Sequence, residues 1–580
     1  MTINLTINDM SVTVPEGTTI LDAARSVNIS IPTLCYLNLH EMKLNNKISS
    51  CRVCMVEVEG RRNLAPSCST PVFEGMVVKT ETHRAIEARR TMLELLLSDH
   101  PKSCLTCAKN LDCELQKLAA ELGIREISFE GEESSYQKDA SSFSIVRDPN
   151  KCIMCRRCET MCSDVQTVGV YSASGRGFQT VVKPAFDRPL IKTSCTFCGQ
   201  CLAVCPTGAL TEVDHVGKVW RELNNPKKTV IVQTAPAVRV ALGELFGADP
   251  GTLVTGKMVS ALRRLGFDMV FDTDFAADLT IMEEASEFAH RLEHGGRLPI
   301  LTSCCPGWVK FFEHQFPDLL DIPSSCKSPH EMFGVVAKTF LANKMGLDPK
   351  NMVVVSIMPC VAKKYEAARP ELGQKPEMPD VDIVITTREL GRMIHEAGID
   401  FNSLPEEDFD RPLGESSGAS VIFGTTGGVI EAALRTAYEW LTGETLEKVD
   451  FESLRGMEGV KEAVIPINGH NLRIAVAHGL GNARKILESI RAGECQYDAI
   501  EIMACPGGCI GGGGQPYHHG NLEILTARAA GLYKEDRSKH IRKSHENPEV
   551  LALYDEFLGE PYSEMAHKLL HTSYTARKRL

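Results

Sequence analysis

The feature that most constrains this chain is a repeated cysteine spacing. Residues 152–162 read CIMCRRCETMC and residues 195–205 read CTFCGQCLAVC, so both runs follow the spacing Cys-x2-Cys-x2-Cys-x3-Cys. In two-cluster ferredoxins with this spacing, the last cysteine of each run binds the cluster held by the other run. We therefore predict two 4Fe-4S clusters, one held by Cys152, Cys155, Cys158 and Cys205, and the other by Cys195, Cys198, Cys201 and Cys162.

The 580-residue chain contains 22 cysteines and carries a net charge of −12. Its first residues lack the basic and apolar regions of a secretion signal, which favours reduced, metal-binding thiols over disulfides. A single core stops growing at about 250 to 300 residues, so several domains are expected. The acidic balance and the lack of an apolar run of about 18 residues argue against binding to nucleic acid or membrane. We predict a cytoplasmic, multi-domain protein.

The N-terminal segment, predicted as a domain over residues 1–80, combines a hairpin with four cysteines. Apolar and polar residues alternate over residues 3–14 around an Asn-Asp turn, and a helix is expected over residues 18–27. One Cys-x2-Cys pair between two further cysteines suits a 2Fe-2S cluster, whereas a zinc ribbon, the alternative, usually has two such pairs. The predicted ligands are Cys35, Cys51, Cys54 and Cys68.

A second predicted domain, residues 81–135, begins with an amphipathic helix over residues 83–97 and continues into DHPKSCLTCAKNLDC. Spacing alone allows structural zinc here, and it equally allows an iron–sulfur cluster in which an imidazole replaces one thiolate. The predicted ligands are His100, Cys104, Cys107 and Cys113. With the double 4Fe-4S module at residues 136–222, three successive modules form an electron path, and residues 223–580 must supply its terminus.

That last segment contains apolar runs that end in loops rich in Cys, Met and Pro. The runs TVIVQ, LPIL, MVVVSI and YDAIEI precede, respectively, the loops that begin at Thr234, Thr302, Met358 and Met503. Alternation with helical stretches such as 257–265 and 331–344 predicts parallel strands covered by helices. Since ligands bind beyond the carboxyl ends of such strands, the four loops are expected to converge on one buried site. The glycines of CPGGCIGGGGQP (505–516) would let backbone approach a bulky inorganic group.

The loops TSCCPGW (302–308), MPCVAKKYE (358–366) and EIMACPGGCIGGGGQP (501–516) resemble the three signature motifs of the FeFe hydrogenases. The order of the upstream modules is similar to that of the long clostridial-type members, so the resemblance covers nearly the whole chain. It implies a β-grasp 2Fe-2S domain, a histidine-ligated 4Fe-4S domain, a two-cluster ferredoxin domain and a large α/β catalytic domain with parallel sheets. The implied activity is the reversible reduction of protons to hydrogen.

The family's cofactor, the H-cluster, joins a 4Fe-4S cubane through one thiolate to a diiron unit with CO, cyanide and a dithiolate. The resemblance implies that Cys509 is the bridging ligand and that Cys304, beside a ligand but not itself one, exchanges protons with the dithiolate amine. The cluster sites use 19 of the 22 cysteines and leave Cys304, Cys326 and Cys495, of which the last two have no assigned role. The implied cubane ligands are Cys305, Cys360, Cys505 and Cys509.

Protons need carriers behind Cys304. Glu284, Glu287 and Arg291 share one helical face, a pattern that by itself favours a solvated, salt-bridged surface. The resemblance instead implies a proton route through Glu284, Ser324 and Glu287 with Arg291 at its outer end.

Around the diiron unit, the resemblance implies that Lys363 donates a hydrogen bond to one cyanide, which would be a charge-assisted bond. Met358 and Met503 would pack near the bridging carbonyl, and Pro236 would contact the other cyanide. The sequence departs from some relatives at two positions. Ala237 stands where they have serine, and His330 stands where they have glutamine.

The electron donor is less constrained. Gly424-x-x-Gly427-Gly428 and Gly479-x-Gly481 do not match the dinucleotide fingerprint, and each is interpreted as a structural turn before a helix. The N-terminal modules also resemble the large iron–sulfur subunit of respiratory complex I. We therefore expect a separate flavin subunit that oxidises NAD(P)H, with a ferredoxin-dependent monomer as the alternative. Maturation enzymes are expected to install the diiron unit.

Two other classes share parts of this pattern. A hydrogenase-like iron–sulfur assembly factor would be expected to lack Cys304, Lys363 and the glutamate pair, all of which are present. A hydrogen sensor would commonly lose the proton-passing cysteine and add a regulatory domain. The basic C-terminal stretch SYTARKRL is expected to be a solvated end.

Overall fold

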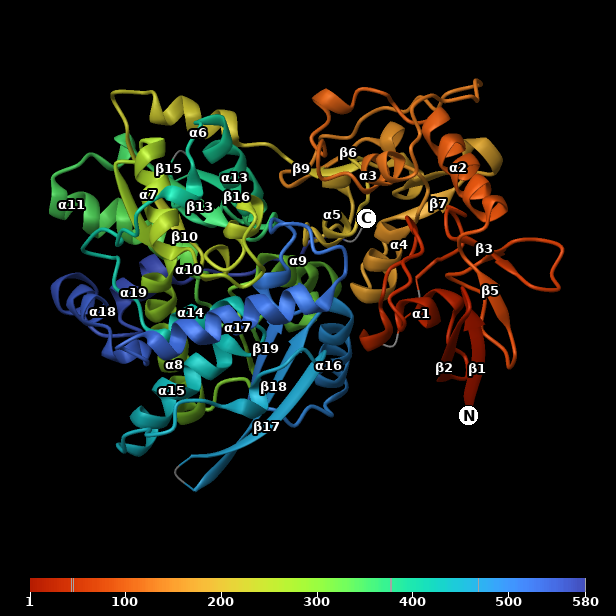
Figure 1. The fold of residues 1–580 in the computed structure, drawn as a ribbon. Coiled ribbons are helices and arrows are strands. Elements are labelled where there is room, and N and C mark those ends of the chain that lie inside the picture. The colour runs from red at the N-terminus through yellow and green to blue at the C-terminus, as the bar shows by residue number, and fades with distance from the viewer. Residues whose placement is uncertain (43, 45, 376–377, 468, 579–580) are drawn as a thin grey trace.

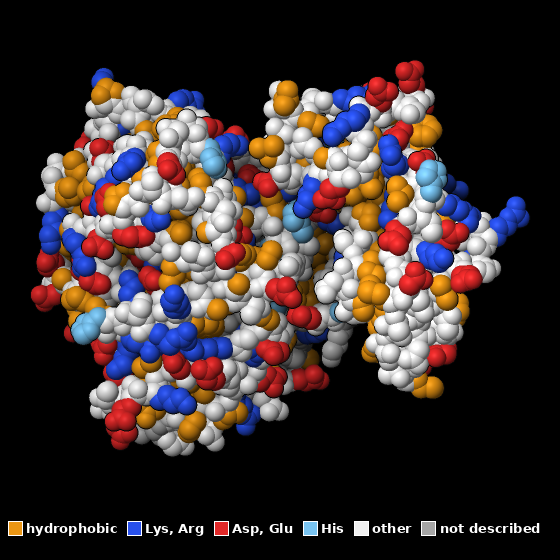
Figure 2. Space-filling model, in the orientation of Figure 1, with side chains coloured by type: hydrophobic (Ala, Val, Ile, Leu, Met, Phe, Trp, Pro, Cys, Tyr) orange, Lys and Arg blue, Asp and Glu red, His pale blue; other side chains and the backbone are white. Residues whose placement is uncertain are grey.

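The computed structural model describes residues 1–42, 44, 46–375, 378–467 and 469–578, which form two lobes (Figure 1). The segments that carry β1 to β9 form one lobe, drawn red to yellow, and those that carry β10 to β19 form the other, drawn green to blue. Acidic and basic side chains are interspersed on the face in Figure 2, without a broad basic surface. No helix within the described ranges is both long and apolar enough to cross a membrane. The four-domain division remains a prediction.

The N-terminal module is a five-stranded sheet packed on one short helix. The strand order is β2-β1-β5-β3-β4, with β1 and β5 parallel and the other pairs antiparallel. Asn8 and Asp9 have φ of 45° and 65°, the left-handed values that a two-residue hairpin turn requires. The elements are β1 (Thr2–Ile7), β2 (Met10–Pro15), α1 (Ile20–Arg25), β3 (Met55–Val58), β4 (Ala65–Pro66) and β5 (Val77–Lys79). The predicted hairpin is confirmed, and the helix is shorter than expected.

The second module consists of α2 (His83–Ser98) and α3 (Glu114–Glu121), joined by the loop that carries its cysteines. Thr82 caps α2 by accepting a hydrogen bond from the backbone N–H of Ala85, an interaction worth about 1 kcal/mol. One apolar cluster joins Leu93 of α2 and Leu115 of α3 to Cys35 of the first module and Cys155 of the third. Three cysteine sites therefore meet at a single junction.

The third module folds the two cysteine runs against each other. β6 (Ile145–Arg147) and β9 (Leu210–Glu212), which flank the runs, pair as an antiparallel two-stranded sheet. Each run contributes a one-turn helix, α4 (Arg157–Thr160) and α5 (Gln200–Ala203), and a second hairpin is made of β7 (Ser172–Ser174) and β8 (Val181–Lys183). This pairing brings the end of one run to the start of the other.

The larger lobe contains two four-stranded sheets. The first has the order β11-β10-β13-β16 and is entirely parallel; the second has the order β12-β19-β18-β17, in which only the β17–β18 pair is antiparallel. The expected parallel sheets are present, with an antiparallel edge strand that the sequence did not predict. The strands are β10 (Thr229–Thr234), β11 (Met269–Asp272), β12 (Ile300–Leu301), β13 (Met352–Met358), β16 (Ile383–Thr386), β17 (Val460–Ile467), β18 (His470–His478) and β19 (Ala499–Met503).

Helix α8 (Thr273–His294) links the two sheets. Phe275 and Leu279, near its start, belong to the core of the first sheet, and Phe288, near its end, packs with Ile300 and Ala499 of the second. The neighbouring helices are α7 (Thr255–Leu265), α9 (Pro306–Gln315), α10 (Pro329–Val336), α13 (Thr387–Glu396), α15 (Gly428–Thr442), α16 (Leu480–Ala492), α17 (Leu522–Ser538) and α19 (Glu564–Leu570).

The two glycine motifs are structural turns, as expected. Gly427 has φ of 93° and directly precedes α15, whose first turn is held by the buried carboxylate of Glu501; this carboxylate accepts hydrogen bonds from the N–H groups of Gly427 (2.6 Å) and Ile430 (2.9 Å). Gly479, with φ of 80°, directly precedes α16. An anion at the start of a helix is favoured by the helix dipole.

The C-terminal end is solvated only in part: Ser573, Thr575, Ala576 and Lys578 are exposed as expected, whereas Tyr574 and Arg577 are half-buried. Arg577 pairs with Glu313 at 2.6 Å, and the hydroxyl of Tyr574 donates to the backbone carbonyl of Ser324 at 2.5 Å. The end of the chain lies at the boundary between the lobes (Figure 1). Basic composition alone could not reveal these buried acceptors.

Candidate active site

A cavity lies where the carboxyl ends of strands from both sheets converge. Its wall contains residues that follow β10, β12, β13 and β19, and apart from Lys363 and His330 it is built from apolar, cysteine, threonine and glycine residues. Ligands are expected at this end of parallel sheets. The predicted site residues that line this cavity are Pro236, Cys304, Cys305, Met358, Cys360, Lys363, Met503, Cys505 and Cys509.

The two adjacent cysteines of SCCPGW directly precede α9. Cys305 is the extended residue before the helix, with φ of −100° and ψ of 105°, and Pro306, whose φ is preset for a helix, occupies the first turn. The indole N–H of Trp308 donates to the backbone carbonyl of Thr302 at 3.0 Å and fixes the loop. The Cys305 sulfur accepts a hydrogen bond from the N–H of Ala504 at 3.4 Å.

Four thiols without a metal would be badly accommodated in this cavity. Burial raises the pKa of Cys360 to about 12, with a further contribution from Cys305, and burial together with neighbouring cysteines raises the pKa of Cys505 and Cys509. Thiolates that repel one another in a dry cavity need a cation, and iron in a cluster supplies it. The donor set therefore fits a cubane held by Cys305, Cys360, Cys505 and Cys509.

Glycines bring the cavity close to the third module. A Cβ on Gly513 would lie 2.6 Å from the Cα of Gly199, and a Cβ on Gly512 would lie 2.2 Å from the carbonyl oxygen of Pro359. The Cys505 sulfur consequently lies 3.9 Å from the carbonyl oxygen of Cys198. The glycine run thus serves contact between the lobes as well as the expected close approach to the cavity.

Lys363 is held in place by a carboxylate that the sequence analysis missed. Its ammonium donates to Glu366 at 2.6 Å and to the backbone carbonyl of Cys304 at 3.1 Å. Burial alone would lower the pKa of Lys363, but Glu366 outweighs this and the pKa is raised. His330 lies 2.7 Å from the same Glu366 carboxylate and 3.0 Å from Glu331. The sequence did contain an indication of this ion pair, because Lys363 and Glu366 lie three residues apart in KKYE.

The helical face of Glu284, Glu287 and Arg291 is not solvated, which excludes the interpretation based on spacing alone. Glu284 and Glu287 are 6% and 2% exposed. The Ser324 hydroxyl donates to Glu287 at 2.9 Å, and Arg291 pairs with Glu287 at 2.5 Å. Burial, followed by repulsion from Glu287, raises the pKa of Glu284 to about 8, while the backbone of Ser303 and then the side chain of Ser324 act in the opposite direction. Burial and the nearby Glu284 raise the pKa of Cys304.

The upstream cysteines also form the predicted groups. One cavity of the third module is lined by Cys152, Cys155, Cys158 and Cys205. The other group consists of Cys162, Cys195, Cys198 and Cys201. Burial is the main cause of the raised pKa of the last three thiols, and the neighbouring cysteines of the group raise it further. In the first module the Cys35 and Cys51 sulfurs are 3.5 Å apart. In the second, a smaller cavity is lined by His100, Cys104, Cys107 and Cys113, and the His100 Nδ1 is buried without a hydrogen-bond partner. An orphaned imidazole nitrogen beside three thiols fits a metal ligand.

Family models match along most of the chain. Residues 228–513 match "Iron only hydrogenase large subunit, C-terminal domain" and residues 522–577 match "Iron hydrogenase small subunit". Upstream, residues 1–83 match a 2Fe-2S iron–sulfur cluster binding domain, residues 89–128 the iron–sulfur binding region of NADH-ubiquinone oxidoreductase-G, and residues 151–209 a 4Fe-4S dicluster domain. Iron–sulfur binding is thereby favoured over zinc in the first two modules.

Individual proteins match over similar lengths. NADP-reducing hydrogenase subunit HndD of Solidesulfovibrio fructosivorans is 63% identical over 100% of both chains, and Iron hydrogenase 1 of Clostridium pasteurianum is 41% identical over 98% of this chain and 99% of its own. Among solved structures, a variant of HydA1 from Chlamydomonas reinhardtii is 47% identical, with a TM-score of 0.57, over 63% of this chain and 99% of its own.

The protonation of Glu284 provides a prediction that can be measured directly. Because the folded-state pKa of about 8 lies above the ordinary value of about 4.3, ionisation of Glu284 removes stability from the folded state as the pH rises from about 4.3 through 8. Difference infrared spectra should therefore show a protonated carboxyl band that titrates with a midpoint near 8 and is absent in Glu284→Gln. A band that persists in the variant, or a midpoint near the ordinary value, would contradict the assignment.

Proposed function

Because the chain belongs to the iron-only (FeFe) hydrogenases, which reduce protons to hydrogen reversibly, we propose that it is the hydrogen-forming subunit of an NADP-linked complex. Its hydrogenase activity depends on electrons carried by iron–sulfur domains on the same chain. The single observation that carries the assignment is the convergence of four cysteines and Cys304 on one cavity at the carboxyl ends of both sheets. Neither an assembly factor nor a sensor accounts for this constellation together with the matches to named hydrogenases.

We propose one 2Fe-2S cluster, three 4Fe-4S clusters and an H-cluster as the resident cofactors. The buried, unpartnered His100 supports histidine ligation of the second module's cluster. Electrons would pass from the first two modules to the third through the junction around α3, where Cys35, Cys113 and Cys155 join one apolar cluster. They would leave the third module where Cys198 approaches Cys505.

At the end of this path, Cys305, Cys360, Cys505 and Cys509 would hold the cubane, with Cys509 shared with the diiron unit. When bound, the H-cluster supplies the two-electron chemistry between protons and hydrogen. The protein keeps the cavity apolar with Pro236, Met358 and Met503. Lys363, charged through its pairing with Glu366, would donate to the cyanide, and Ala237 offers no hydroxyl for the second one.

Cys304 and the α8 carboxylates would carry protons. Cys304 is kept as a thiol by burial, and Glu284, whose pKa is about 8, exchanges protons readily near neutral pH. Ser324 lies between Glu284 and Glu287, since its hydroxyl bonds to Glu287 and lowers the pKa of Glu284. Arg291 neutralises Glu287 and lies nearest the solvent among these residues, with 13% of its side chain exposed. The route would therefore run from the cavity along α8 to the surface.

A flavin subunit that exchanges electrons with NADP(H) is the proposed electron partner, because the relative with 63% identity is named as a subunit of an NADP-reducing hydrogenase. Ferredoxin remains the second candidate, since the clostridial relative with 41% identity matches over the same length and is named as a hydrogenase, not as a subunit of one. We further propose that the protein acts in the cytoplasm, where clustered thiols stay reduced. Maturation enzymes would install the diiron unit.

Cys304→Ser separates proton transfer from cluster binding. The variant should retain every iron–sulfur cluster and lose hydrogen turnover by at least about 10²-fold, because a serine hydroxyl is too weak an acid to replace the thiol. Turnover is measured by hydrogen evolution from a reduced dye, and cluster content by iron analysis and electron paramagnetic resonance. Cys495→Ser, a cysteine outside every predicted ligand set, is the matched control. Wild-type turnover in Cys304→Ser would remove the proton role.

Native purification tests the electron partner. The affinity-tagged chain, isolated from its own cells, should bring down a flavin-containing partner, and the purified assembly should reduce NADP⁺ with hydrogen. The chain alone should have no activity with NADP⁺ because neither glycine motif in the described residues forms a dinucleotide site. A lone chain that shows full activity with reduced ferredoxin would instead favour the second candidate.

A further inference from the structure

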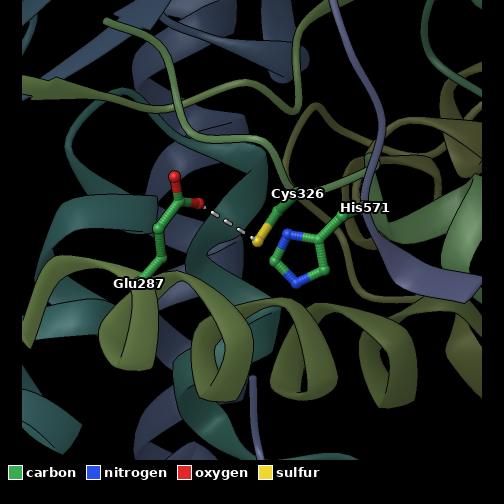
Figure 3. A group of neighbouring side chains, drawn as sticks. All are labelled: Glu287, Cys326 and His571. Carbon is green, nitrogen blue, oxygen red and sulfur yellow. Dashed lines mark hydrogen bonds between the residues drawn. The ribbon is translucent and has the colours of Figure 1, made fainter. Parts of the chain in front are cut away.

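Cys326 belongs to none of the predicted cluster sites, yet it is 1% exposed and lies between two other potential metal ligands. Figure 3 shows its sulfur next to the ring of His571 and facing the carboxylate of Glu287. The sulfur lies 3.9 Å from Glu287 Oε2, and one ligand atom from each of the three residues lies within 4.8 Å of the others. A thiol, an imidazole and a carboxylate are the ligand types that Zn²⁺ prefers.

The backbone holds two of these residues directly opposite each other. Cys326, in the loop before α10, and His571, just after α19, form an isolated antiparallel bridge. The flanking N–H groups of Lys327 and Thr572 donate to the carbonyls of Leu570 (2.8 Å) and Ser325 (2.7 Å). Glu287 approaches from α8, so three separate elements contribute one ligand each. The arrangement does not depend on a flexible surface loop.

The imidazole of His571 is already oriented as a zinc ligand would be. Its Nε2 lies 3.0 Å from Oε2 of Glu283, a carboxylate that is 0% exposed, while Nδ1 bonds to the Ser325 hydroxyl at 2.8 Å. A carboxylate on the outer nitrogen of a metal-binding histidine fixes its tautomer and raises its basicity. Nδ1 is therefore the nitrogen that would turn to the metal, in exchange for its bond to Ser325.

Surface histidines lead from solvent to this position. His571 stacks on the exposed His567 with ring centroids 4.2 Å apart, and His567 packs against Tyr562. Tyr562 also packs against the exposed His290, which stacks on the exposed His294 with ring centroids 4.3 Å apart. These imidazoles can capture a cation at the surface and pass it to His571.

We propose that Glu287, Cys326 and His571 form a Zn²⁺ site whose occupation closes the proton route. Three protein ligands leave the fourth tetrahedral position to water or to Ser325. Metal–ligand distances of about 2.0 to 2.3 Å require the three side chains to draw in by about 1 Å. Cys326 faces Oε2 of Glu287, the oxygen that accepts the hydrogen bond from Ser324, so a metal on Oε2 competes with that hydrogen bond, whereas Arg291 contacts Oε1. The closure, but not the zinc site itself, rests on the proposed proton route.

Zinc K-edge absorption spectroscopy of the cluster-loaded full chain, with Zn²⁺ added at one equivalent, tests the site. We expect one sulfur at about 2.3 Å together with nitrogen and oxygen at about 2.0 to 2.2 Å. In Cys326→Ala the sulfur contribution should vanish and the affinity for Zn²⁺ should fall at least tenfold, and His571→Gln should weaken binding similarly. Cys495→Ala should bind zinc as the wild type does. Weak, non-stoichiometric binding, or a sulfur contribution that persists in Cys326→Ala, would overturn the site.

Hydrogen evolution, measured with and without Zn²⁺ for each variant, tests the closure separately. We expect zinc to inhibit the wild type and Cys495→Ala at least tenfold, and Cys326→Ala far less, with each rate compared to that variant's own rate without zinc. Zinc bound through Cys326 that leaves turnover unchanged would overturn the closure and count against Glu287 as a proton carrier. Absence of zinc binding would overturn the site and leave the proton route untouched.

Discussion

The crowding of four thiols in one buried cavity is the constraint on which the rest of this structure depends. Burial raises the pKa of these thiols in the absence of metal, and the neighbouring thiols raise it further. The largely apolar wall offers few hydrogen-bond donors against this, among them Lys363 and backbone N–H groups. Such a site is stable as a metal site and costly as anything else. The parallel strands of the two sheets meet at their carboxyl ends, where loops from four distant strands can converge.

In the proposed function, electrons and protons would reach this cavity from different sides. The third module, which would deliver electrons, contacts the cavity loops at Cys198 and where Gly199 packs against Gly513. The acidic face of α8, which would carry protons, runs from the cavity toward Arg291. The separation follows from the fold, because α8 links the two sheets while the cluster-binding lobe packs against the loops. Each path thus has its own set of side chains, and a change in one need not disturb the other.

Local spacing predicted the parts of the site that depend on few residues. The spacing of the two ferredoxin runs predicts that each run gives its fourth cysteine to the other's cluster. Apolar runs predict the strands that precede the site loops, and the predicted bounds of β10 and β13 differ from the observed ones by one residue at most. The structural turns at Gly427 and Gly479 were predicted because the dinucleotide fingerprint was incomplete. In each case, neighbours in sequence supply most of the physical information.

Contacts between distant segments could not be read in this way. The spacing of Glu284 and Glu287 favoured a solvated face, and only packing between the two sheets buries them. The docking of Arg577 on Glu313 depends on residues 264 positions apart, and so does not appear in composition. Cys326 had no assigned role because His571 becomes its neighbour only through the antiparallel bridge.

Infrared spectroscopy of the protein after maturation tests the central claim most directly. Metal-bound CO and cyanide absorb where no protein side chain does, so a chain that holds the H-cluster on Cys305, Cys360, Cys505 and Cys509 should show these bands. Replacement of the proposed bridging ligand, Cys509→Ala, should abolish them. Their absence after competent maturation, with all iron–sulfur clusters in place, would contradict the account.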